Sequence, residues 1–225
     1  MNAQEYCEMV EQKYRQHLQL LPTISIKENN SRLISLKQSE FNLIFEPSIK
    51  KKYEYLVREA VFEKIGRISR VLDKQNKILI IRSVWRSFEH QRLLREDKVE
   101  TLRKQNPNKQ IKEIREFVSY FIAPPSKSMH STGGAVDALI YDSKNECVMD
   151  FGTNNGFKID LNDKCYPYHP FIPPQAKKNR KLLINLFEKE DFVVDIKEYW
   201  HFDYGNASWA IEKEKKYSIY GIIKE

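Results

Sequence analysis

The sequence predicts an α+β protein with a central antiparallel sheet and flanking helices. Apolar residues recur at helical spacing through much of the first half of the chain. The segment 77–85 (KILIIRSVW) is rich in β-branched residues and is typical of a buried strand. Short strand-like segments then follow one another at hairpin spacing near the C-terminus, which favours an antiparallel sheet.

The first 125 residues are expected to be mainly helical around the strand 77–85. We expect a helix over 3–20, a short strand over 31–36, and a helix from 49 to 72. A long amphipathic stretch over 89–121 predicts two helices that are interrupted near Asn106 and Pro107, because proline cannot continue a helix.

The character of the chain changes after Pro124 and Pro125. A turn-rich entry and a strand are expected over 126–142, with a returning strand at 146–149. The segment 152–174 is rich in Gly, Asn, Asp and Pro and predicts a long ordered loop. A helix over 175–189 and strands over 192–196, 199–205 and the C-terminal YSIYGII complete the pattern. We expect one domain over 1–225, with a helical part to about residue 75 and the core from about residue 76.

Composition excludes several classes of protein. Hydrophobic residues make up 41% of the chain and charged residues 31%, which is ordinary for a globular protein. No apolar run approaches the roughly 20 residues that cross a bilayer, and the N-terminus lacks the pattern of a secretory signal. The cysteines, Cys7, Cys147 and Cys165, are odd in number and have no CxxC spacing, so we expect neither a disulfide framework nor a cysteine zinc site. A cytoplasmic location follows as an expectation.

The formal net charge of +7 raises the alternative of a nucleic-acid binder. Acidic residues are interspersed among the lysines and arginines, as in KKYEYLVREAVFEKIGRISR, and this is typical of solvated helix faces. We therefore expect no nucleic-acid partner. Salt-dependent binding to DNA or RNA would support the alternative.

The first candidate metal ligands are His130 and Asp137, which flank Gly133 and Gly134. Imidazole nitrogen and carboxylate oxygen both suit zinc. Residues seven apart face opposite sides of a straight strand, so the two side chains converge only if His130 lies on a bent entry loop. The glycine pair allows that bend. A structural histidine beside a glycine pair is the alternative.

The second candidate group is EYWHF, residues 198–202. Glu198 and His201 combine a carboxylate with an imidazole, as a general base beside a metal ligand requires. They converge only if the chain turns or bulges at 197–199, with His201 on the strand proper. The alternative is an edge strand with an exposed Glu198 and a packed Trp200.

Arg86, in SVWRSFEHQ, follows the strand 77–85. An arginine just past a strand end can reach into a cleft, where its fixed charge stabilises a developing oxyanion. A surface salt bridge is the alternative interpretation.

Taken together, these segments resemble the D-alanyl-D-alanine dipeptidase family, which includes the vancomycin-resistance dipeptidases (peptidase family M15). SMHSTGGAVD (128–137) fits the family pattern Ser-x-His-x-x-Gly-x-Ala-x-Asp, and EYWHF resembles Glu-x-Trp-His-Phe. VWRSFEHQ is similar to the family's Tyr-Arg-Pro segment, and 176–192 is similar to the helix before the second motif. The order and spacing match from about residue 78 to 205.

The resemblance implies a Hedgehog/DD-peptidase-like fold and zinc-dependent hydrolysis of D-alanyl-D-alanine. It implies one Zn²⁺ held by His130, Asp137 and His201, Glu198 as catalytic base, and Arg86 as stabiliser of the tetrahedral intermediate. A small D-amino-acid peptide is the expected substrate, and Ser128, Asn155 and Trp200 are the expected substrate-binding residues.

The sequence departs from the family pattern at two places. Ser87 replaces the proline after the arginine. In FGTNNGF (151–157), Asn155 and Gly156 lie where the family has the aspartate that pairs with the substrate's ammonium group, and Asp160 or Asp163 would have to substitute. A carboxypeptidase or peptidoglycan peptidase acting on longer D-amino-acid peptides, and a non-catalytic cell-wall peptide-binding module, therefore remain alternatives.

Overall fold

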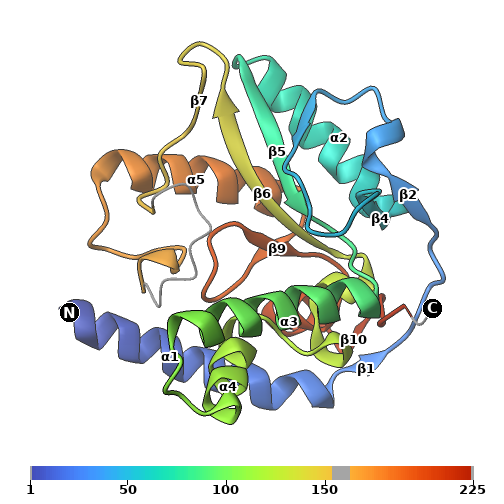
Figure 1. The fold of residues 1–225 in the computed structure, drawn as a ribbon. Helices are drawn as coiled ribbons and strands as arrows, with labels where there is room; N and C mark the ends of the chain where they lie inside the picture. The colour runs from blue at the N-terminus through green and yellow to red at the C-terminus, as the bar shows by residue number, and fades with distance from the viewer. Residues whose placement is uncertain (1, 154–162, 224–225) are drawn as a thin grey trace.

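A six-stranded mixed sheet occupies the centre of the computed structural model, which describes residues 2–153 and 163–223 (Figure 1). Its strand order is β3-β5-β6-β9-β8, and β7 pairs with the far end of β6. The pairs are antiparallel except for β3 with β5, which is parallel. The strands are β3 (Leu43–Phe45), β5 (Lys77–Ser83), β6 (Ala135–Asp142), β7 (Cys147–Val148), β8 (Val193–Val194) and β9 (His201–Asp203).

Six α-helices surround the sheet in the described residues. They are α1 (Ala3–Leu20), α2 (Glu59–Asp73), α3 (Phe88–Gln105), α4 (Ile111–Phe121), α5 (Pro174–Lys189) and α6 (Ala207–Glu212). Helices α2 and α5 flank the long strands, whereas α1, α3 and α4 gather at the end of the sheet away from β7 (Figure 1). Two small sheets, β1 (Ser25–Ile26) with β10 (Tyr217–Ser218) and β2 (Leu33–Ser35) with β4 (Leu56–Arg58), complete the fold.

The main hydrophobic core lies between the sheet and the helices α2 and α5. The apolar face of α2 supplies Val61, Ile65, Ile68 and Leu72, and α5 supplies Leu183, Ile184 and Phe187. These side chains pack against both long strands, β5 and β6, whose middle residues are almost fully buried. Burial of this apolar surface fixes the strand register, because a slip by one residue would turn the core face of a strand outward.

The register of the sheet brings three polar residues into one row. Ser83 of β5 lies opposite Asp137 of β6, and Asp137 lies opposite His201 of β9. Residues that face each other across antiparallel strands project from the same face. The pairing of β5 with β6 shifts register between Ile81 and Ser83, and such an irregularity redirects side chains next to a site.

The α+β prediction is confirmed, and most elements lie where the sequence placed them. The helices over 3–20 and 175–189, the two helices interrupted near residue 106, and the returning strand after β6 are all present. Helix α1 begins with a capping box in which Asn2 and Glu5 satisfy each other's backbone N–H groups.

The prediction of a helix from residue 49 was wrong in its first half. Helix α2 begins only at Glu59, and Leu56–Arg58 is a strand that pairs with β2. The strand β3 was missed, and the first 75 residues therefore contain β1 to β4 as well as helices. No helix among the described residues is long and apolar enough to span a membrane. The cytoplasmic location stays a prediction.

Candidate metal centre

His130 lies on a short 3₁₀ turn, Met129–Thr132, that leads into β6. The turn ends at Gly133, whose φ of 76° lies in the left-handed region that glycine adopts without strain. The bend that convergence of His130 and Asp137 requires is therefore present at the predicted place. Ser131 holds the turn by donating from Oγ to the carbonyl oxygen of Arg86 at 3.0 Å.

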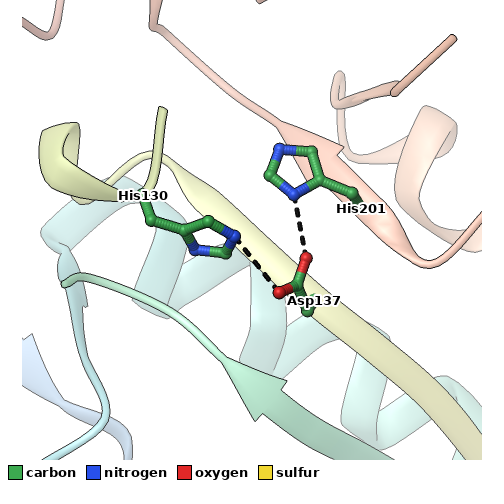
Figure 2. A group of neighbouring side chains, drawn as sticks. All are labelled: His130, Asp137 and His201. Atoms are coloured by element: carbon green, nitrogen blue, oxygen red, sulfur yellow. Dashed lines mark hydrogen bonds and ion pairs between the residues drawn. The ribbon is translucent and has the colours of Figure 1, made fainter. Parts of the chain in front are cut away.

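Asp137, His130 and His201 form one cluster (Figure 2). One ligand atom from each lies within 4.8 Å of the others, and all three side chains are buried. His130 Nε2 is 3.2 Å from Asp137 Oδ2, and His201 Nδ1 is 2.8 Å from Asp137 Oδ1. Asp137 thus lies between the two imidazoles, with one carboxylate oxygen toward each.

The other nitrogen of each imidazole is held by an acceptor. His130 Nδ1 lies 2.8 Å from the carbonyl oxygen of Val84, and His201 Nε2 lies 3.2 Å from Asp203 Oδ1. Each of these nitrogens must carry a proton to donate. In a neutral ring the inner nitrogen then has a lone pair, which faces the carboxylate of Asp137. A divalent cation among these lone pairs relieves their repulsion, so the donor set fits zinc.

Protonation of the two histidines differs because their surroundings differ. Burial, followed by the positive charge of Arg86, lowers the pKa of His130 to about 4 and keeps its ring neutral. Burial also disfavours charged His201, but the carboxylates of Asp203 and Asp137 raise its pKa well above the usual value. Burial likewise opposes ionisation of Asp137, yet the two histidines hold its pKa well below its usual range. Asp137 is therefore ionised, and a positive charge beside it is favoured at His201 but not at His130.

Arg86 reaches the cluster, as its position after the strand predicted. Its guanidinium donates to Asp137 Oδ2 at 2.9 Å and to Ser83 Oγ at 2.7 Å. A third donation goes to Gln91 Oε1 at 3.2 Å, and Gln91 in turn donates to the carbonyl oxygen of Ala123. The fork of Arg86 is therefore oriented from three sides, which fixes a positive charge at the edge of the cluster.

Glu198 lies on the turn that precedes β9. Its carbonyl oxygen accepts from the N–H of His201 at 3.1 Å, which closes the turn that the sequence required at 197–199. Asp195 Oδ1 accepts from the backbone N–H groups of both Lys197 and Glu198. Burial, then the carboxylate of Asp195, raises the pKa of Glu198 to about 8. The charge of Asp137 also raises this pKa, and the charges of His201 and Arg86 lower it.

The expected substrate-binding residues have different positions. Ser128 is buried directly before the turn that carries His130, and Trp200 is buried in the main core against Tyr199. Asn155 and Asp160 lie outside the described residues. Of Asp163, the structure describes the backbone alone. Contacts of Ser128, Asn155 and Trp200 with a substrate stay predictions.

Asp203 is one of the site residues that the sequence interpretation missed. Its carboxylate is almost fully buried, accepts from Asn206 Nδ2, and contacts His201. Residues two apart on a strand share a face, so the pattern His-x-Asp in the expected strand 199–205 was the available signal. Ser83 and Gln91 were also missed, because their role depends on the conformation of Arg86.

Comparison with known proteins places these residues in a family context. Residues 42–219 match the sequence model of peptidase family M15, described as D-Ala-D-Ala dipeptidase. A D-alanyl-D-alanine dipeptidase of Escherichia coli (strain K12) is 35% identical over 81 residues, which are 36% of this chain and 40% of the relative. The chain thus aligns with less than half the length of that relative.

Solved structures of similar fold were also found. VanYB in complex with D-alanine-D-alanine has a TM-score of 0.50 and 13% identity, covering 87% of this chain and 93% of the other. The LD-carboxypeptidase LdcB has a TM-score of 0.48 and 16% identity, covering 84% and 75%. At 13% identity the likeness to VanYB concerns the fold alone, and it agrees with the expected DD-peptidase-like α+β architecture.

Proposed function

Because the chain belongs to peptidase family M15, the D-Ala-D-Ala dipeptidase family, we propose that it is a zinc-dependent dipeptidase that hydrolyses D-alanyl-D-alanine to D-alanine. The observation that carries the proposal is the cluster of His130, Asp137 and His201, in which each histidine keeps one nitrogen for a cation and has the other one fixed. One zinc ion per chain fits this donor set.

The three proposed ligands are His130, Asp137 and His201. A zinc ion bound there would supply a Lewis acid and would lower the pKa of a water molecule to about 7. Three protein ligands are typical of catalytic zinc sites, in contrast to the four of structural sites. The carbonyl oxygen of Val84 contacts the other nitrogen of His130, and the carboxylate of Asp203 contacts that of His201. These two acceptors orient the rings and favour one tautomer of each.

Glu198 is the proposed general base. Its carboxylate takes the proton from the attacking water and then returns it to the nitrogen of the leaving amino acid, as general acid–base catalysis requires. A raised pKa suits both halves of this task, because the group binds and releases a proton near neutral pH. Arg86 provides a fixed positive charge for the oxyanion of the tetrahedral intermediate.

The proposal is tested by measuring D-alanine release from D-alanyl-D-alanine by the zinc-loaded protein. We expect Glu198→Ala to lower kcat by at least about 100-fold, because general acid–base catalysis contributes roughly 100- to 10,000-fold, while the bound zinc, measured by elemental analysis, stays at the wild-type level. Glu116→Ala, at an exposed position of α4, is the matched control and should keep full activity. Release of D-alanine by Glu198→Ala at the wild-type rate would reject the mechanism.

A second candidate is a carboxypeptidase or peptidoglycan peptidase for longer D-amino-acid peptides. It is favoured by the uncharged Asn155 and Gly156, which lie where the family has an ammonium-binding aspartate. A panel of peptides with free and acetylated amino termini separates the two candidates. Strict dependence on a free amine supports the dipeptidase, whereas equal cleavage of blocked peptides supports the longer substrate.

A further inference from the structure

Helix α1 lies outside the residues that match the family model, yet its side chains reach the segments around Glu198. Its first half lies beside the segment that follows the undescribed residues (Figure 1). Tyr6 packs against Tyr166 and His169, with ring centroids 6.3 and 5.4 Å apart. Tyr6, Val10 and Tyr166 form a small buried cluster, against which Ile196 also packs.

One carboxylate oxygen of Glu11, on α1, contacts both Tyr166 and Lys197. Glu11 Oε1 accepts from the hydroxyl of Tyr166 at 2.6 Å and lies 3.1 Å from Lys197 Nζ. Lys197 directly precedes Glu198, and its side chain is only 11% exposed. The same ammonium group lies 4.7 Å from the ring centre of Tyr14, one turn further along α1. Charge-assisted contacts of this kind are stronger than neutral hydrogen bonds and orient both partners.

The residues that Glu11 contacts lie in the turn of Glu198 and in the segment beside that turn. Backbone N–H groups of Lys197 and Glu198 donate to Asp195, so the turn is already fixed from within. Tyr199 donates its N–H to the carbonyl oxygen of Cys165, next to Tyr166. Glu11 adds the connection to α1. The contact of Lys197 with the ring of Tyr14 places that ring beside the turn, and burial, then the carboxylates of Asp195, Glu198 and Glu11, raise the pKa of Tyr14.

We propose that Glu11 is a positioning residue, which holds the turn of Glu198 in its catalytic geometry through Lys197 and Tyr166. This inference rests on the proposed function. Helix α1 has further contacts with α6, where Lys13 pairs with Glu212 at 3.0 Å and His17 Nε2 contacts Ser208 Oγ at 3.1 Å. These contacts hold the helix without Glu11, so loss of the Glu11 contacts should change the turn rather than the helix.

The test compares Glu11→Ala and Glu11→Gln with Lys13→Met. The control Lys13→Met breaks an ion pair of the same helix with Glu212 of α6. A displacement of about 1 Å in a catalytic group can lower the rate on the order of 100-fold. We expect kcat to fall about 10-fold in Glu11→Ala, with KM and bound zinc within about twofold of wild type. Glu11→Gln keeps an acceptor for Tyr166 and should restore part of the rate, and Lys13→Met should leave kcat unchanged.

Hydrogen exchange of the backbone amides supplies a second measurement that needs no activity. The N–H groups of residues 197–199 should exchange faster in Glu11→Ala than in the wild type or in Lys13→Met. Equal exchange in all three proteins, or an equal fall of kcat in Lys13→Met, would overturn the inference. If the wild type hydrolyses none of the peptides, the proposed function fails, and the exchange data alone still decide whether Glu11 holds the turn.

Discussion

At the scale of single residues, the position of His201 between two carboxylates has a consequence for metal affinity. Asp203 accepts from Nε2, so that in the neutral ring Nδ1 has its lone pair toward Asp137. We expect Asp203→Asn to weaken zinc binding about 10- to 100-fold, as loss of such an outer partner does at zinc sites. Competition with a chelator of known affinity measures the effect.

Asp191→Asn is the control for this prediction, because Asp191 is an exposed carboxylate that pairs with Lys213. It should bind zinc as the wild type does. The role of Asp203 is contradicted if Asp203→Asn keeps its zinc affinity within twofold while it remains folded.

The pH dependence of activity is a second property of single residues. Burial and the carboxylates of Asp195 and Asp137 raise the pKa of Glu198, whereas His201 and Arg86 lower it. The base must be deprotonated, so kcat/KM rises as the pH rises through this pKa. Asp195→Asn removes a negative neighbour but keeps an acceptor for the turn, and should move the acidic limb to lower pH. The metal is common to both proteins, so the difference between their pH profiles reports Asp195. A limb that stays or moves to higher pH would contradict this account.

The sequence predicted the residues of the cluster better than it predicted their partners. His130, Asp137, His201 and Glu198 were expected to converge because a bend and a turn made convergence possible, and both features are present. Asp203 follows His201 in the pattern His-x-Asp, a signal that the interpretation did not use. Gln91 carried no comparable motif, because its role depends on the conformation of Arg86, which local patterns do not contain.

At the scale of elements, the entry to β6 depends on Gly134 having no side chain. A Cβ atom there would lie 2.2 Å from the backbone oxygen of Tyr204, which belongs to the chain leaving β9. Neither backbone can yield without disturbing the β6–β9 pairing, whose register sets Asp137 opposite His201. We expect Gly134→Ala to lower the free energy of unfolding by about 2–3 kcal/mol, as measured by urea denaturation, and to reduce activity.

Gly221→Ala is the matched substitution. A Cβ atom there meets the side chain of Ile26 at 3.2 Å, and a small movement of that exposed side chain relieves the contact. Its cost should stay below about 1 kcal/mol. Equal stability of the two variants would show that the backbone contact at Gly134 does not constrain the strands.

The helix expected from residue 49 shows how an element is misread. Tyr53, Leu56, Val57 and Ala60 fit helical spacing, but the buried positions are Tyr53, Tyr55 and Val57, which alternate as in a strand. Short apolar segments are compatible with either period, and the pairing of β4 with β2 decides the outcome. The three-residue strand β3 was missed for the same reason, since it depends on parallel pairing with β5.

At the scale of the whole molecule, the order of elements was predictable but their long-range connections were not. The sequence indicated an α+β chain whose candidate metal ligands, His130, Asp137 and His201, lie in its second half. It contained no sign that residues 25–26 pair with 217–218, or that α1 reaches the turn of Glu198. Such contacts join positions nearly the whole chain apart, and their stability depends on loop closure and burial together.

The buried guanidinium of Arg58 connects the turn of His130 with the segment around Ser31. It donates to the carbonyl oxygens of Thr132 at 2.8 Å and Ser31 at 2.6 Å, and pairs with Glu28 at 3.1 Å. The turn of His130 is therefore tied to the N-terminal segment. Arg58→Met leaves these acceptors without their donor, and we expect a loss of about 3 kcal/mol in the free energy of unfolding.

Arg32→Met provides the comparison, because Arg32 is an exposed arginine of the same segment that pairs with Glu59. Its substitution should cost less than about 0.5 kcal/mol, since exposed ion pairs contribute little. Zinc affinity of the two folded variants tests whether Arg58 also holds the turn of His130. Loosening of Thr132 in Arg58→Met releases the turn that carries His130, so zinc binding should weaken in Arg58→Met and stay unchanged in Arg32→Met. If Arg58→Met lost stability without losing zinc affinity, the turn would be held by Gly133 and Ser131 alone.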